Sequence, residues 1–285
     1  MFIRALDQAI CKFLCFAFGI MLALSLFFKA MYSFDDSPYF TRNNWIDLLA
    51  LMICLIFYYL IYRFAGKIEK IHTAFLWTIF GAIALIYIFM VPLAPFSDMY
   101  YVDYGAKLIG EGKTNEILGN SYLQMISKNL KVAFFYSLFL RILPATTFSI
   151  KCVNVLCYLF TIHFISKISD NFDYKYPKNV FILGGTFLPA LLYCNHVYFD
   201  LPTLCFCVLG VYFYTRHDRK LLIAAIFLGI ACCLRVLAYI FVIAVLLDFL
   251  FRNCKVLFEN HCRKLVVFLL STLIIACTPI GVNDY

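Results

Sequence analysis

The chain has 285 residues, of which 64% are hydrophobic and only 14% are charged. A soluble domain carries roughly a quarter charged residues, so this composition excludes an ordinary soluble protein and indicates a multi-pass membrane protein. The net charge of +8 does not indicate nucleic-acid binding, because the basic residues lie in short loops between apolar runs, where membrane topology explains them.

Nine apolar runs follow one another along the chain, and each is interpreted as a membrane-spanning helix, which needs about 20 apolar residues. The expected spans are 9–30, 45–62, 73–93, 150–166, 179–197, 201–214, 221–234, 236–251 and 265–279. The expected fold class is therefore an all-α polytopic membrane bundle. Pro189 and Pro202 predict broken or kinked helices among the later runs.

Segment 131–141 decides the expected topology, because it is apolar but only about three helical turns long. If it does not cross the membrane, 15 of the 24 lysines and arginines lie on one side and 9 on the other. If it crosses, 8 lysines and arginines lie on the side of the N-terminus and 16 on the other side. The positive-inside rule favours the first arrangement. We therefore expect a plasma-membrane protein with a cytoplasmic N-terminus, in which 131–141 is an interfacial or re-entrant helix.

In this topology the polar loop 95–129 lies on the external face. Long polar loops on a membrane bundle are places where water, a lipid headgroup and carboxylates can meet. We expect short amphipathic helices in this loop and divide the chain into three regions. These are an N-terminal three-helix region (1–94), an external catalytic loop with its interfacial helix (95–149) and the remaining helix bundle (150–285).

Five residues are candidates for chemistry, and each has a simpler structural alternative. Asp98 is a candidate general base or a solvated loop carboxylate. Asp103 follows five residues later, about 140° around a helix, so it is not expected to share a face with Asp98. Asp200 is a functional carboxylate or a helix cap. Arg235 and, more weakly, Arg141 are phosphate ligands through their guanidinium forks, or they snorkel to the interface.

Histidine and cysteine patterns do not predict a zinc site. The five histidines are scattered, without paired metal-ligand spacing, and most of the 13 cysteines lie inside apolar runs. Buried thiols in such runs behave as small hydrophobic side chains.

Three stretches, taken in order, resemble membrane glycosyltransferases of the GT-C superfamily. The closest resemblance is to bacterial proteins of the protein O-mannosyltransferase type, in glycosyltransferase family 39. The stretches are Pro95-Phe96-Ser97-Asp98 with Val102, Ala106, Leu108 and Gly110; Tyr122-Leu123-Gln124 to Asn129 with 134–141; and 197–202 with Gly229 and 234–244.

The resemblance implies an inverting hexosyltransferase that moves a sugar from a polyprenyl-phosphate donor in the bilayer to an external acceptor, which is a cell-envelope glycan, a lipid or a protein. Asp98 would deprotonate the acceptor hydroxyl, and Arg235 with Arg141 would hold the leaving phosphate. Asp200 would help to bind the acceptor, a divalent metal ion or the sugar, and this metal ion is the one cofactor considered. Asp103 is a further candidate for binding substrate or the donor phosphate, without a role given by the resemblance. Relatives continue beyond the ninth span, so the resemblance implies a fragment, a truncated gene product or a reduced member of the family.

Two alternatives remain open from the sequence. A transporter or flippase of a lipid-linked or small substrate would place ionisable residues deep within its spans. The candidates here gather at one surface, with the exception of His163. This clustering favours an enzyme that acts on headgroups. The second alternative is a non-catalytic, truncated relative of the glycosyltransferases.

Overall fold

The computed structural model describes residues 44–118, 120, 122, 127–216, 220–253 and 262–277, together with 12–13, 16–17, 19–20, 28–32 and 38–42. The chain divides into two compact units, Met1–Phe64 and Ala65–Tyr285. All five candidate residues belong to the second unit. The division into regions 1–94, 95–149 and 150–285 stays a prediction.

The first unit is partly helical and contains one short antiparallel hairpin that was not predicted. Strand β1 (Phe28–Tyr32) pairs with strand β2 (Pro38–Arg42). The expected span 9–30 is therefore wrong at its C-terminal end, although the described residues between 12 and 20 are helical. Phenylalanine and tyrosine, which are frequent in these two segments, favour strands as well as contributing to apolar runs, so the apolar run alone did not distinguish a strand from a helix.

Helix α2 (Trp45–Arg63) closes the first unit and matches the expected second span. It begins with a capping box, in which Asn44 and Asp47 exchange backbone-to-side-chain hydrogen bonds of 2.9 Å. These bonds satisfy backbone N–H groups that have no partner within the helix. Most of its apolar side chains are exposed, which suits a helix that faces lipid.

Among the described residues, three helices are long and apolar enough to cross a membrane: α2, α4 (Thr73–Met90) and α9 (Thr147–Asn171). The other apolar helices are shorter. With 16 residues, α12 (Asp200–Thr215) is about 24 Å long, less than the ~30 Å hydrocarbon core. The shorter apolar helices also include α13 (Leu221–Leu234), α14 (Tyr239–Asn253), which follows the 3-10 turn η1 (Val236–Ala238), and α15 (Cys262–Cys277). The chain is thus predominantly helical with membrane-helix character, and nine crossings stay a prediction.

The expected span 179–197 is not one continuous helix. It consists of α10 (Pro177–Gly185) and α11 (Leu188–Tyr193), with Pro189 in the first turn of α11. The break predicted from Pro189 is confirmed, because proline cannot continue the hydrogen bonds of a helix. Pro202 likewise lies in the first turn of its helix, α12, where the missing N–H costs nothing, so it too follows a break, between Tyr193 and Asp200.

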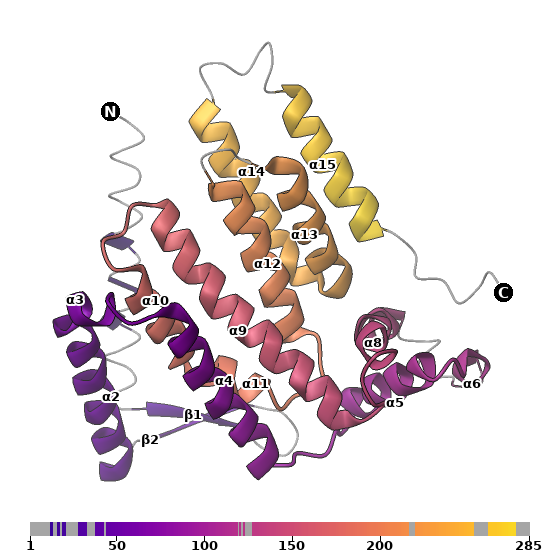
Figure 1. The fold of residues 1–285 in the computed structure, drawn as a ribbon, viewed down its shortest axis with the longest axis horizontal. Coiled ribbons are helices and arrows are strands. Elements are labelled where there is room, and N and C mark those ends of the chain that lie inside the picture. Colours follow the sequence, from indigo (N-terminus) through magenta and orange to yellow (C-terminus); the bar gives the residue numbers. More distant parts are fainter. Residues whose placement is uncertain are drawn as a thin grey trace. The chain divides into compact units, whose positions relative to one another are not determined.

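The polar loop does carry helices, as predicted. These are α5 (Asp98–Gly110), α6 (Thr114–Leu118) and α8 (Ser127–Leu140), so the helix predicted at 131–141 begins four residues earlier. Helices α5 and α8 lie side by side (Figure 1) and pack on each other. The face of α5 that contains Val102 and Ala106 is fully buried, so this pair forms a folded layer rather than an open loop.

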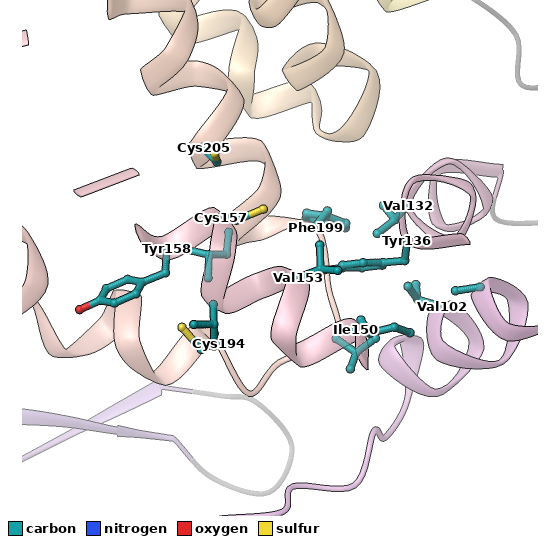
Figure 2. Close-up of a cluster of buried hydrophobic side chains, with 14 of the residues drawn as sticks. Val102, Val132, Tyr136, Ile150, Val153, Cys157, Tyr158, Cys194, Phe199 and Cys205 are labelled. Atoms are coloured by element: carbon teal, nitrogen blue, oxygen red, sulfur yellow. The ribbon is translucent and has the colours of Figure 1, made fainter. Parts of the chain in front are cut away.

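Helix α9 runs through the middle of the second unit (Figure 1) and packs against α4, α8, α10 and α12. Figure 2 shows Tyr136 extending from α8 toward α9, near Val153, with Val102 and Ile150 close by. A second core lies beyond α12, where α13 packs between α12 and α15. Helices α5 and α8 are thereby fixed to α4, α9 and α12 by one continuous apolar core.

Close packing of α12 against α13 depends on Gly210. A Cβ at this position would lie 2.6 Å from Leu228 Cγ and 3.3 Å from the Ala224 carbonyl oxygen. We expect Gly210→Ala to lower the free energy of unfolding by about 1–3 kcal/mol through overpacking, more than the 0.5–1 kcal/mol gained from helix propensity. Thermal unfolding in detergent, followed by circular dichroism, measures the change.

The matched control is Gly66→Ala, because nothing lies within 4 Å of a Cβ at Gly66. This variant should unfold at or above the wild-type temperature. Equal unfolding temperatures for the two variants would contradict the packing assigned to α12 and α13.

Candidate functional site

Asp98 is the first residue of α5 and follows an unusual backbone position. Ser97, the N-cap residue, has a φ of 50°, and its side chain makes no capping hydrogen bond. For a residue with a side chain this conformation costs on the order of 1–3 kcal/mol, and such strain concentrates at functional sites. The strained turn directs α5 so that its first carboxylate meets two tyrosines from other segments.

Two tyrosine hydroxyls hold the Asp98 carboxylate. Tyr122 donates to Oδ1, and Tyr198 donates to Oδ2 at 3.0 Å. Tyr122 is itself fixed: Asn129 Nδ2 donates to its hydroxyl at 3.2 Å, and the Tyr101 ring stacks on it with a centroid distance of 3.8 Å. The orientation of the Asp98 carboxylate is therefore set by Tyr122 and Tyr198, and Tyr122 is held in turn by Tyr101 and Asn129.

Both tyrosines remain protonated donors at neutral pH. Burial, together with the hydrogen bond to Asp98 and its charge, raises the pKa of Tyr122 and of Tyr198 to about 12. Each hydroxyl proton is thereby available to the carboxylate across the physiological range.

The turn between α11 and α12 is held by a buried hydrogen-bond network. The Tyr136 hydroxyl lies 2.6 Å from Asn154 Oδ1 and 2.7 Å from the Tyr198 carbonyl oxygen, and Asn154 Nδ2 donates to the His196 carbonyl at 2.7 Å. Tyr136 and Asn154 are fully buried. The backbone that carries Tyr198 is thus fixed from α8 and α9 at once.

The segment that precedes α5 is anchored in the same way. Asn195 Nδ2 donates to the Val91 carbonyl, and Lys151 Nζ donates to the Leu93 carbonyl at 2.6 Å. Residues 91–93 and the 195–200 turn are therefore tied together beside the first turns of α9.

Asp200 and Arg235 form an ion pair at the other end of this turn. The guanidinium carbon also lies 4.6 Å from the centroid of the Phe199 ring, a cation–π contact. Asp200 is the first residue of α12, and Arg235 directly follows α13. Each charge is thus favourable for its helix end. With 24% and 33% of their side chains exposed, both remain accessible to water.

Asp103 and Arg141 do not join this group. Asp103 is buried and binds Lys107 Nζ at 2.6 Å and the Thr147 hydroxyl at 3.1 Å, so it links α5 to the start of α9. This agrees with the prediction that Asp103 and Asp98 do not share a face. Arg141 is exposed just after α8, and the described part of the chain shows no contact between it and Asp98, Asp200 or Arg235.

The sequence analysis gave no role to Tyr198, Tyr136 or Asn154, although all three build the site. One signal was available: Asn154 is a lone amide in an apolar run, and a polar group there needs partners. No comparable signal marks the tyrosines, because aromatic residues are frequent throughout this chain.

The site residues do not fit the divalent metal ion that the resemblance implies for Asp200. Within the described ranges, no three histidine, cysteine, aspartate or glutamate side chains gather closely enough to hold a metal ion. The oxygens of Asp98 and Asp200 face O–H and N–H donors, which present positive charge where a metal ion would bind.

Comparisons of the chain with protein-family models, with curated proteins and with solved structures gave no match.

Removing the Tyr136 hydroxyl should loosen the turn that carries Tyr198. Tyr136→Phe leaves the Asn154 oxygen and the Tyr198 carbonyl without this buried donor, and we expect a loss of about 1–3 kcal/mol. Thermal unfolding in detergent is the measurement. Tyr100→Phe, at a tyrosine that is 52% exposed, is the matched control. Similar unfolding temperatures for both variants would show that the network does not stabilise the fold.

Proposed function

We propose that the chain is an inverting membrane glycosyltransferase that moves a hexose from a polyprenyl-phosphate donor to the hydroxyl of an external acceptor. The observation that carries the proposal is the arrangement of three consecutive residues. Tyr198 binds the Asp98 carboxylate, Phe199 contacts the Arg235 guanidinium, and Asp200 pairs with Arg235. A candidate base and a candidate phosphate ligand are therefore neighbours across one short turn.

Asp98 acts as the general base in this mechanism. The carboxylate would accept the hydrogen bond of the acceptor hydroxyl, since each carboxylate oxygen accepts more than one hydrogen bond. As Asp98 takes the hydroxyl proton, the acceptor oxygen forms a bond to the anomeric carbon from the face opposite the phosphate. Tyr122 and Tyr198 keep the carboxylate in the orientation that this proton transfer needs.

Arg235 stabilises the leaving group. When the bond between the anomeric carbon and the phosphate oxygen breaks, the electron pair stays on the phosphate, and a guanidinium can contact two of its oxygens. Such a fixed cation is most effective where water is scarce. The products are an inverted glycoside, a protonated Asp98 and the polyprenyl phosphate.

Helix ends, rather than helix centres, carry the reactive groups. Asp98 begins α5, Asp200 begins α12, and Arg235 follows α13. A transporter that binds its substrate at the membrane midplane would place such groups near the middle of its helices. The position at helix ends supports chemistry at a membrane surface, where a lipid-linked donor presents its phosphate and sugar.

The proposal places this surface outside the cell. With 18 residues, helix α4 is about 27 Å long and separates Lys70 from the segment that contains Asp98 and Lys113. In a cysteine-depleted protein, Lys113→Cys should react with a membrane-impermeant maleimide added outside intact cells. Lys70→Cys should react only after the cells are opened. The reverse pattern would refute the external site.

Asp98→Asn should lower transfer by about 10²–10⁴-fold, because an amide of the same size cannot take the acceptor proton. The assay measures release or transfer of labelled sugar from polyprenyl-phosphate hexoses by the purified chain. The matched control is Asp170→Asn, a carboxylate on α9 that is paired with Lys167 and 54% exposed. Near wild-type turnover by Asp98→Asn, with expression like that of the control, would leave Asp98 as a loop carboxylate.

A further inference from the structure

We infer that Asp200 is the resting counter-ion of Arg235 and that the donor phosphate displaces it from the guanidinium. The inference rests on the proposed function and deepens it. It gives Asp200 a role other than binding sugar, acceptor or metal: its carboxylate occupies the phosphate site while the site is empty.

Arg235 is already fully oriented without a ligand. Its guanidinium pairs with Asp200 at the start of α12, and the Phe199 ring lies against it. A guanidinium has five N–H donors and can bind two oxygens of an anion at once. Asp200 Oδ1 pairs with Nη1 of Arg235 and therefore occupies part of the donor set that a phosphate would use.

Phosphate and Asp200 cannot share this position at low cost. The donor is a phosphodiester with a single negative charge, and the polyprenyl phosphate that it leaves is a monoester with a charge of about −1.5 to −2 at neutral pH. A carboxylate within contact distance would repel either of them. Donor binding is therefore stronger when Asp200 moves away or loses its charge. Because 24% of the Asp200 side chain is exposed, the released carboxylate has water available to solvate it.

The fold does not depend on this ion pair for the position of the turn. Tyr136 and Asn154 bind the carbonyls of Tyr198 and His196, and those bonds do not involve Asp200. The pair is half-buried, with 24% of the Asp200 side chain and 33% of the Arg235 side chain exposed, so Arg235 keeps contact with water when the carboxylate is removed. A variant without the carboxylate should therefore fold, and its effect should appear in phosphate binding.

Titration of the purified full-length chain in detergent with farnesyl phosphate tests the inference. Isothermal titration calorimetry should show roughly tenfold tighter binding to Asp200→Asn than to wild type, because a charged hydrogen-bonded competitor has been removed. Asp170→Asn, which changes the net charge equally at an exposed site on α9, should bind like wild type. Arg235→Leu should lose binding.

Equal or weaker binding by Asp200→Asn would overturn the inference, since Asp200 would then position Arg235 or bind the ligand itself. Absence of binding to wild type and to Asp200→Asn would overturn it as well. If Asp200→Asn does not fold, Asp200→Ser gives the same comparison, because serine is also favoured at a helix start. The sugar-transfer assay on wild type tests the proposed function separately. Transfer by wild type without tighter phosphate binding by Asp200→Asn would contradict only the displacement of Asp200. Tighter binding by Asp200→Asn without transfer by wild type would contradict only the proposed glycosyltransferase activity.

Discussion

The buried hydrogen bonds among Tyr136, Asn154 and the 195–200 turn are the constraint on which the candidate site depends. A turn between two helices exposes backbone carbonyls, and in apolar surroundings each of them needs a partner. The Tyr136 hydroxyl and the Asn154 amide supply these partners for Tyr198 and His196. Without them the turn would have no fixed direction, and neither Tyr198 nor Asp200 would have a defined place.

This turn joins groups that are far apart in the sequence. Asp98 begins a helix that follows the third apolar run, whereas Arg235 lies near the end of the chain. Three consecutive side chains, Tyr198, Phe199 and Asp200, touch one or the other of them. A change at Arg235 can therefore reach Asp98 through residues that are adjacent in the chain, without a long path of contacts.

Short helices and breaks are what allow this arrangement. A continuous helix over 179–197 would carry the chain straight through the region where the turn now lies. Instead α10 and α11 are separate, and α12 starts at Asp200. Buried backbone that is not helical is tolerated where protein groups satisfy its hydrogen bonds, and Tyr136 on α8 and Asn154 on α9 do so here.

Composition and the order of apolar runs were enough to predict a predominantly helical membrane protein, the helices at 45–62 and 73–93, and the break at Pro189. These features follow from hydrophobicity and from the backbone chemistry of proline, which are local properties of the sequence. The hairpin at Phe28–Arg42 was missed, since an apolar run rich in aromatic residues is compatible with a strand as well as a helix. The number of crossings stays a prediction, because three of the described helices have the required length and composition.

The sequence by itself determined that Asp98, Asp200 and Arg235 stand at the boundaries of apolar segments, where ionisable groups can reach water. It also determined that Asp103 faces away from Asp98, because helix geometry fixes that angle. Only the tertiary structure decided which of these groups meet. Tyr122 and Tyr198 reach Asp98 from 24 and 100 residues away, and Asp200 takes Arg235 as its partner. Such pairings depend on how α5, α8, α9 and α12 pack, and no local pattern in a chain with 20 tyrosines distinguishes the two that bind the carboxylate.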